Sequence, residues 1–345
     1  MINKIEISNF LAFRRDDKSI VESFNINFSD GVNIFIGENG TGKTSLLKML
    51  FAACEYSKNN HHLNVSGSKK FKNYFVSNVE NTGMLLNYDT GDGYSYFKVE
   101  ANEKYFEYKT SLSEDFSRGF VGLDEWRTLD IKPIFIPSKE MLSHSKGLLA
   151  MHMKMEIPFD VTLIDILANA QLPVSREVSP LDKILLDKIS DIIDGEVVYE
   201  NDTFYAVKRG GMKLEFSLEA EGLRKFGLLW KLIRNGLLND KTILFWDEPE
   251  ANLNPTLIPV LVDFLIELHR TGIQMFIATH DYSFVRYFDL KKNNSSVLFH
   301  NLYKNKNGYI ECDSSTGYIQ LNNNAFEKAD KALYDMIVNK ALEAF

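Results

Sequence analysis

Cysteine is scarce in this sequence, which holds only Cys54 and Cys312 among its 345 residues. So few cysteines exclude the disulfide-rich class of small secreted domains and suit a reducing cytosol. The apolar fraction of 45% and the charged fraction of 25% are ordinary for a globular protein. A core of normal size can therefore form without disulfides or a structural metal.

Long apolar runs are also absent. No stretch approaches the roughly 20 apolar residues that a membrane-spanning helix needs. Residues 1–10 lack the charged-then-apolar pattern of a signal peptide, and no lipidation signal is visible. We therefore expect a soluble, cytoplasmic protein without a membrane partner.

Positive charge is in deficit, because 39 lysines and arginines stand against 47 aspartates and glutamates and leave a net charge of −8. This balance removes the simple argument for a nucleic-acid-binding surface, although a local basic patch can coexist with an acidic whole. The nearest candidates are Lys69–Lys70 with Lys72, and Lys208–Arg209. These groups are small, and we interpret them as solvated surface.

Strand and helix patterns alternate along the sequence. Apolar residues at helical spacing run from Ser45 to Cys54, directly after the apolar run from Val32 to Ile36. Later strand-like runs cover 134–136, 242–246 and 273–278, with a helical segment at 257–269. This alternation predicts an α/β nucleotide-binding domain.

Two inserted regions interrupt the alternation. Aromatic runs separated by turn residues predict an antiparallel β subdomain over 56–113. The region 138–236 is predicted to form a helical lid, with a β-hairpin at 196–216 and a long helix from about Glu219 to Arg234. We expect both regions to belong to one domain that spans residues 1–345.

The segment from Gly37 to Thr44, Gly-Glu-Asn-Gly-Thr-Gly-Lys-Thr, matches the P-loop pattern at every fixed position. Its glycines let the backbone curl so that amide groups face phosphates, and the following helix directs its positive N-terminus at them. We expect catalytic Lys43 to contact the β- and γ-phosphates and the Thr44 hydroxyl to bind Mg²⁺. The predicted ATP-binding residues are Gly37, Asn39, Gly40, Thr41, Gly42, Lys43, Thr44 and Ser45.

A second motif, Ile243 to Glu248, is an apolar strand that ends in two carboxylates. Asp-Glu-Pro at a strand end can also be an ordinary turn, but the P-loop upstream favours a functional pair. Asp247 would hold Mg²⁺ through water, as in other P-loop enzymes. Glu248 is placed to act as the general base on the attacking water.

A third motif places His280 at the end of the strand-like run Ile273 to Ala278. A lone histidine is more often structural. This one follows the acidic pair by a short helix and strand, where a sensor of the γ-phosphate is expected. We therefore assign His280 to the catalytic set.

These motifs, in this order and spacing, resemble the Walker A, Walker B and switch-histidine elements of the ABC-type ATPases. Glu250 to Pro255 resembles that family's D-loop, and Ile5 to Phe10 resembles the opening strand of its recombination and repair branch. The strings Asp247–Pro255 and Ile136–Glu140 are similar to those of stand-alone AAA/OLD-like ATPases from bacterial antiphage defence loci. The resemblance covers essentially the full length and implies an ABC-type ATPase head with ATP and Mg²⁺ as cofactors.

ABC-type ATPases typically dimerise head to tail, with each nucleotide between one P-loop and the other subunit's signature motif. The resemblance places that motif at Leu218 to Lys225, where Ala220 replaces the usual serine, Glu221 replaces the first glycine, and Gly222 fits. Gly222 would contact the partner's nucleotide. Ser138 stands in place of the Q-loop glutamine, and Asn254 replaces the D-loop aspartate.

Three functions follow from the resemblance. The first is an ATPase that dimerises on ATP, as a homodimer or higher oligomer, and switches a separately encoded effector in antiphage defence, a nuclease being one candidate. The second is a DNA-repair or DNA-binding ATPase of the RecF-like kind, without a long DNA-bridging coiled coil, because the segment between Thr44 and Ala220 is too short for one. The third is a nucleotide-binding scaffold with little turnover.

Overall fold

The computed structural model describes residues 1–13, 23–58, 73–75, 94–111, 119–155, 159–292 and 296–343. The basic residues Lys69, Lys70 and Lys72 lie outside the described residues. Within these ranges, no helix combines the length and the apolar character needed to span a membrane.

A sheet with the strand order β14-β13-β3-β12-β11-β7 forms the centre of the molecule. Its parallel strands are β13 (Val297–Lys304), β3 (Val32–Gly37), β12 (Gln274–Ala278), β11 (Thr242–Asp247) and β7 (Lys132–Ile136), and β14 (Ile310–Ser315) pairs antiparallel at one edge. Every residue of β3, β11 and β12 is buried. This explains their continuous apolar runs, because a parallel sheet is covered on both faces.

A second, antiparallel sheet has the order β2-β1-β4-β5-β6. Its strands are β1 (Ile2–Ser8), β2 (Phe24–Asn27), β4 (Tyr94–Ala101), β5 (Lys104–Ser111) and β6 (Gly119–Val121). The β subdomain expected over 56–113 therefore contributes β4 and β5, while β1 and β2 come from before the P-loop. The pairing of β1 with β4 joins distant segments, which a local pattern does not reveal. Residues 59–72, 76–93 and 112–113 of that segment lie outside the described residues.

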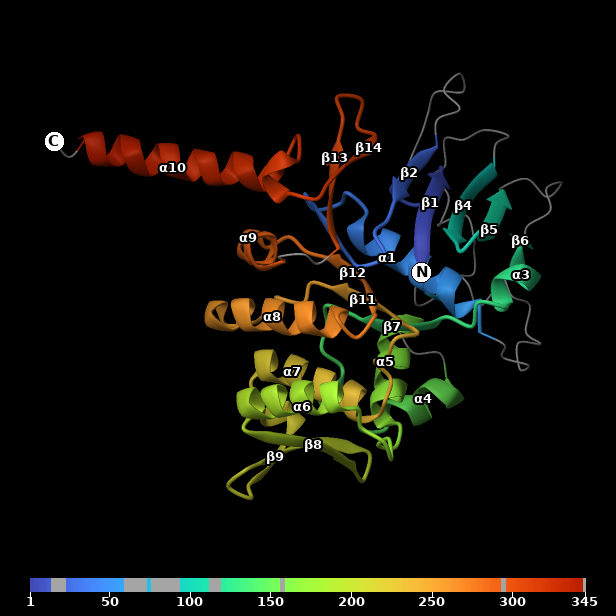
Figure 1. The fold of residues 1–345 in the computed structure, drawn as a ribbon, viewed down its shortest axis with the longest axis vertical. Helices are drawn as coiled ribbons and strands as arrows, with labels where there is room; N and C mark the ends of the chain where they lie inside the picture. Colours follow the sequence, from blue (N-terminus) through green and yellow to red (C-terminus); the bar gives the residue numbers. More distant parts are fainter. Residues whose placement is uncertain are drawn as a thin grey trace.

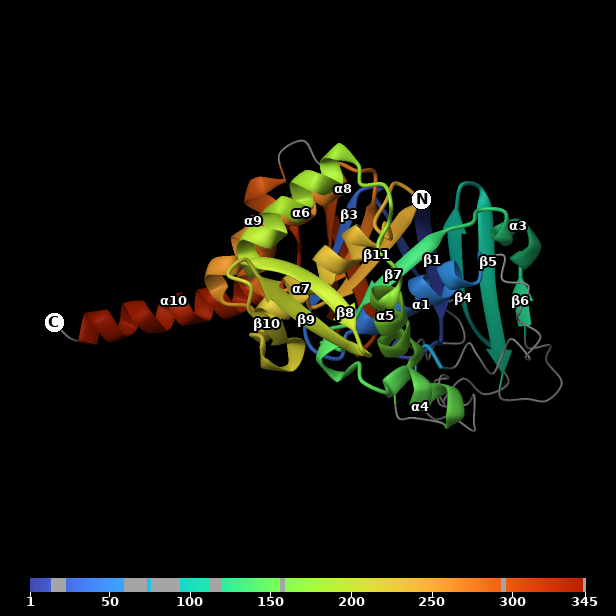
Figure 2. The ribbon, with the colours of Figure 1, turned by 90° about the horizontal axis from the view of Figure 1, so that it is seen from below.

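Helix α1 (Lys43–Glu55) lies between the two sheets (Figures 1 and 2). Its apolar residues share one core cluster with Phe97 and Val99 of the antiparallel sheet and with Phe245 and Phe276 of the parallel sheet. On the antiparallel side, the short helix α3 (Leu123–Arg127) buries Trp126, whose indole Nε1 donates to the Ala53 carbonyl at 2.7 Å. The helix that follows the P-loop is thus fixed from both sides.

A helical layer covers the opposite face of the parallel sheet (Figure 1). It consists of α5 (Val161–Gln171), α6 (Pro180–Ile193), α7 (Glu221–Arg234), α8 (Ile258–His269) and α9 (Tyr282–Lys291), with the small helix α4 (Leu148–Lys154) beside α5. An outer antiparallel sheet of three strands, β8 (Gly195–Glu200), β9 (Thr203–Lys208) and β10 (Lys213–Glu215), packs on this layer. It extends the hairpin expected at 196–216 by a third strand. The expected lid, 138–236, contains α4 to α7 and this sheet.

The last helix, α10 (Ala325–Glu343), projects away from the body (Figures 1 and 2). It leaves apolar side chains exposed, among them Leu333, Tyr334, Met336 and Ile337. Short 3₁₀ turns occur at Leu142–His144, Phe216–Leu218, Pro255–Leu257 and Tyr318–Gln320.

We expect Trp126→Ala to lower the free energy of unfolding by about 3–5 kcal/mol, because it removes a fully buried ring and the partner of the Ala53 carbonyl. Urea unfolding measures the change. The control Leu290→Ala, at a side chain that is 71% exposed, should change stability by less than about 0.5 kcal/mol. Equal stability of the two variants would contradict this role of Trp126.

Candidate functional site

The carboxyl ends of three neighbouring strands bring the predicted motifs together. In the sheet register, Asp247 of β11 lies opposite Ala278 of β12, and Ala278 lies opposite Phe35 of β3. The amide of Glu248 donates to the Ala278 carbonyl at 2.8 Å, which continues this pairing beyond the strands. Segments more than 200 positions apart in sequence thus meet at one edge of the sheet.

The P-loop backbone leaves no room for side chains at two of its glycines. Gly37 has φ 142°, and a Cβ on it would lie 2.1 Å from the Leu302 carbonyl oxygen. Gly42 has φ 88°, and a Cβ there would lie 2.9 Å from the ring of Phe13. This loop leads directly into the N-terminus of α1, so its amides and the helix dipole suit an anionic ligand.

Lys43 is the first residue of α1, and its side chain curls back over the loop. Its Nζ donates to the carbonyls of Gly37 at 2.7 Å and Glu38 at 3.0 Å. Burial lowers the pKa of Lys43, against the opposing effect of Glu248 and Asp247. The ammonium is therefore poorly solvated, and hydrogen bonds to phosphate oxygens would stabilise its charge.

Thr44 and Asp247 converge from α1 and β11. The Thr44 hydroxyl lies 3.0 Å from both carboxylate oxygens of Asp247. Burial raises the pKa of Asp247 to about 6, partly offset by the hydrogen bond from Thr44. A hydroxyl and a buried carboxylate are oxygen donors of the kind that Mg²⁺ prefers, so these residues fit the expected cation.

Glu248 and His280 meet at the mouth of the site. His280 Nδ1 lies 2.9 Å from Glu248 Oε1, and the two side chains are 51% and 32% exposed. Glu248 has φ 51°, in the left-handed region, which costs about 1–3 kcal/mol for a residue with a side chain. A base held in this strained turn is positioned by the surrounding structure.

A cleft of about 240 Å³ lies between the P-loop and Glu248. Its walls are formed by Ala12, Asn39, Gly40, Gly42, Lys43, Thr44, Ser45 and Glu248. Sequence reasoning missed Ala12. The cleft therefore brings P-loop residues and the expected base into one space.

Glu250 is a further buried carboxylate beside the site. Its Oε1 accepts a hydrogen bond from Thr279 Oγ1 at 2.7 Å, which ties the turn after β11 to the end of β12. Burial raises the pKa of Glu250 to about 7. Sequence reasoning placed Glu250 only in the D-loop string and gave it no role.

The signature-like segment, Leu218 to Lys225, contributes no side chain to the lining of this cleft in its own chain. Ala220 caps α7, and a Cβ on Gly222 would lie 3.2 Å from the Asn252 carbonyl oxygen. The contact expected of Gly222 belongs to a second chain and stays a prediction. Asn254 accepts from the Thr256 amide at 3.0 Å and so caps a 3₁₀ turn.

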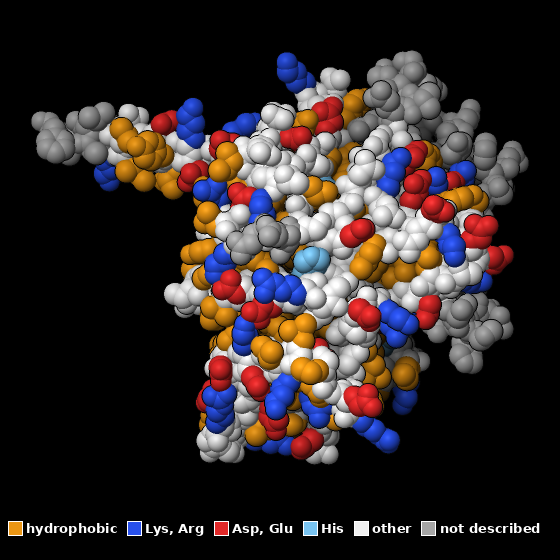
Figure 3. Space-filling model, viewed as in Figure 1, with side chains coloured by type: hydrophobic (Ala, Val, Ile, Leu, Met, Phe, Trp, Pro, Cys, Tyr) orange, Lys and Arg blue, Asp and Glu red, His pale blue; other side chains and the backbone are white. Residues whose placement is uncertain are grey.

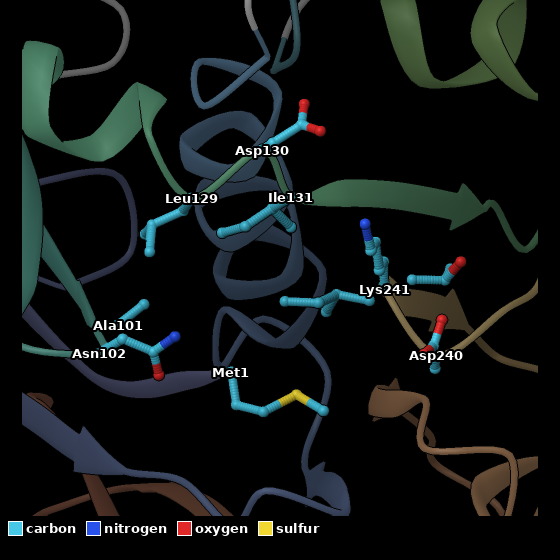
Figure 4. A pocket seen from close by; sticks show the side chains of 10 residues that line it. Met1, Ala101, Asn102, Leu129, Asp130, Ile131, Asp240 and Lys241 are labelled. Atoms are coloured by element: carbon cyan, nitrogen blue, oxygen red, sulfur yellow. The ribbon is translucent and has the colours of Figure 1, made fainter.

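Another pocket, also of about 240 Å³, lies at the amino ends of β7 and β11 (Figure 4). It is lined by Met1, Ala101, Asn102, Leu129, Asp130, Ile131, Asp240, Lys241, Thr242 and Ile243. Ligands of open parallel sheets bind at the carboxyl ends of the strands, so this pocket is separate from the candidate nucleotide site.

Known proteins share the fold of this chain. A family profile described as "AAA domain" matches residues 4–138, and one described as "AAA domain, putative AbiEii toxin, Type IV TA system" matches residues 137–286. An SmcHead structure bound to the C-winged helix domain of ScpA has a TM-score of 0.59 at 12% identity, over 91% of this chain and 97% of that chain. This chain has the fold of an ABC-type P-loop ATPase.

Other solved structures are similar to this ABC-type fold. The Smc head domain from Pyrococcus furiosus, with an extended coiled coil and bound to the C-terminal domain of ScpA, has a TM-score of 0.52 at 12% identity, over 97% of this chain and 99% of that chain. The SMC head domain from Thermotoga maritima has a TM-score of 0.47 at 15% identity, over 91% and 98% of the two chains. A search of the curated proteins gives no match.

We expect Asp247→Asn to stabilise this ABC-type fold at pH 7.5. The pKa of Asp247 rises on folding from 3.8 to about 6, so the folded state binds the proton more tightly and loses stability as pH rises through that interval. The variant lacks this cost, and its free energy of unfolding should exceed that of the unmodified chain by about 1–3 kcal/mol at pH 7.5 and by much less at pH 4. Urea unfolding in EDTA, without nucleotide, measures both.

The control is Glu248→Gln, at the partly exposed neighbouring carboxylate, which should change stability by less than about 0.5 kcal/mol. A loss of stability in Asp247→Asn at pH 7.5 would show that the Asp247 charge is favourable in the folded chain.

Proposed function

We propose that this chain binds ATP with Mg²⁺ in the P-loop cleft and hydrolyses it to ADP and phosphate. The observation that carries the proposal is the meeting of Thr44 with Asp247, at 3.0 Å, beside the Glu248–His280 pair at 2.9 Å. One pair supplies oxygen ligands for a cation and the other supplies a base with an orienting partner. Both pairs lie within the same strand-end site.

Each residue has a distinct task in this proposal. The P-loop amides and Lys43 bind the phosphate oxygens, and Thr44 and Asp247 hold Mg²⁺. A bound Mg²⁺ neutralises charge that develops on the phosphates. Glu248 takes the proton of the attacking water, and His280, whose Nδ1 faces Glu248, steadies that carboxylate and the water.

We further propose that two copies close on ATP, and that this closure switches a separately encoded effector. The cleft is half open, since Glu248 and His280 are partly exposed, and Ala220 to Lys225 of a second chain would cover it. A role in antiphage defence rests on the resemblance of Asp247–Pro255 and Ile136–Glu140 to ATPases from bacterial defence loci, and the profile over residues 137–286 is described as "AAA domain, putative AbiEii toxin, Type IV TA system". The SMC heads of the same fold are bound to a domain of ScpA, a separate protein, which supports a protein partner for this chain.

A second candidate is a DNA-repair or DNA-binding ATPase, favoured by the SMC-head fold. The face shown in Figure 3 carries basic and acidic side chains interspersed, without a continuous basic area. This face offers little electrostatic attraction for a phosphate backbone, and the net charge of −8 also disfavours such binding. The ATP-dependent switch is therefore the function we prefer. If the chain does not hydrolyse ATP, we expect a nucleotide-binding scaffold instead.

We expect the unmodified chain to hydrolyse ATP and Lys43→Ala to lose about 100-fold or more in turnover, because the phosphates lose their nearest cation. Phosphate release measures the rate. Turnover equal to that of Lys43→Ala would favour the scaffold.

Glu248→Gln should bind ATP, stop before hydrolysis and accumulate as a dimer. Light scattering after size exclusion, with saturating ATP and Mg²⁺, gives the mass. The matched control is Glu38→Gln, an exposed carboxylate in the P-loop, which should remain monomeric during turnover. If Glu248→Gln stays monomeric with saturating ATP, the proposal that two copies close on ATP is wrong. Salt-dependent binding of the unmodified chain to duplex DNA would favour the second candidate.

A further inference from the structure

A buried lysine of α7 contacts the turn that carries the expected base. Lys225 Nζ donates to the Glu248 carbonyl at 3.0 Å and to the Pro249 carbonyl at 3.2 Å. The residue is only 5% exposed. A buried charged side chain needs hydrogen-bond partners to offset its loss of hydration. For Lys225 these partners are two backbone carbonyls of the turn at the site.

The turn itself needs outside support. Glu248 has φ 51° and Asn252, four residues later, has φ 61°. Within the turn, the Ala251 amide donates to the Glu248 carbonyl at 3.1 Å, so that oxygen accepts from Lys225 and from the backbone together. Conformations of this kind persist when surrounding contacts over-determine them.

The charge of Lys225 is also matched locally. Its ammonium interacts with the carboxylates of Glu250, Glu221, Glu248 and Asp247, although burial still lowers its pKa to about 8. Of these, Glu250 is buried and bonded to Thr279. Through Lys225 and Glu250, helix α7 is thus connected to Thr279 at the end of β12.

Two further contacts bind the start of α7 to neighbouring loops. Glu221 Oε1 accepts from Asn252 Nδ2 at 2.7 Å. Arg224 Nη1 lies 3.2 Å from Glu140 Oε2, in the segment after β7. A displacement of α7 therefore changes contacts to the turn after β11 and to the segment after β7 at once.

We propose that Lys225 is a positioning residue that holds the Glu248–Pro249 turn and makes the orientation of Glu248 depend on the position of α7. This role rests on the proposed hydrolysis, since it gives the base its geometry without touching the substrate. It also connects the base to Ala220–Lys225, the segment proposed to meet the second copy.

The test compares the full chain with Lys225→Met, which keeps the aliphatic stem, and Lys225→Arg, which keeps a cationic donor. The control is Lys231→Met, on the same helix and also 5% exposed. Hydrogen exchange of the amides of Glu248, Ala251 and Leu253 reports the turn, and ATP turnover reports the base.

Lys225→Met should speed exchange at these amides about tenfold and lower kcat about 10–100-fold, with KM within about threefold of the unmodified chain. Lys225→Arg should restore most of both, and Lys231→Met should change neither. Exchange at the unmodified rate in Lys225→Met would overturn the inference. Faster exchange with unchanged kcat would reduce Lys225 to a structural contact and overturn it as well.

The experiment separates this inference from the proposed function. If the unmodified chain hydrolyses ATP no faster than Lys43→Ala, the proposed function fails, while the exchange rates still decide whether Lys225 holds the turn. If Lys225→Met does not fold, Lys225→Gln, which keeps a shorter uncharged donor, is judged by the same two criteria.

Discussion

The parallel register of β3, β12 and β11 is the constraint on which the site depends. Because Asp247, Ala278 and Phe35 lie side by side in that register, the residues that follow each strand are forced into one place. This register alone brings the P-loop, the acidic pair and His280 together. Helix α1, fixed between two sheets, then brings Thr44 to 3.0 Å from Asp247.

Burial of charge is the second theme of the molecule. Four charged residues of the site are buried: Lys43, Lys225, Asp247 and Glu250. Desolvation lowers the pKa of the two lysines and raises the pKa of the two carboxylates, so in each case it favours the neutral form. The left-handed backbone of Glu248 adds local strain. A site of this kind costs stability in the folded chain. Its neighbouring contacts, such as Thr279 with Glu250 and Lys225 with two carbonyls, offset part of that cost.

Much of the α/β fold was predictable, because a P-loop between an apolar strand and a helix, and an acidic pair at the end of another apolar strand, are local patterns. The pairing of β1 with β4 was not predictable, because paired residues such as Ile2 and Ala101 are 99 positions apart in the sequence. A pattern read in a short window does not show which distant strands pair. Within the site, Lys225 was named only as the end of the signature-like segment. Its bonds to Glu248 and Pro249 arise from the docking of α7, which no spacing rule specifies.

The most direct measurement is a crystal structure of the chain with Mg²⁺ and a non-hydrolysable ATP analogue. The account predicts Mg²⁺ bound to the Thr44 hydroxyl with Asp247 beside it, Lys43 Nζ on phosphate oxygens, and the Glu248 carboxylate facing the γ-phosphate. An analogue bound outside the P-loop cleft, or a cation that contacts neither Thr44 nor Asp247, would contradict it.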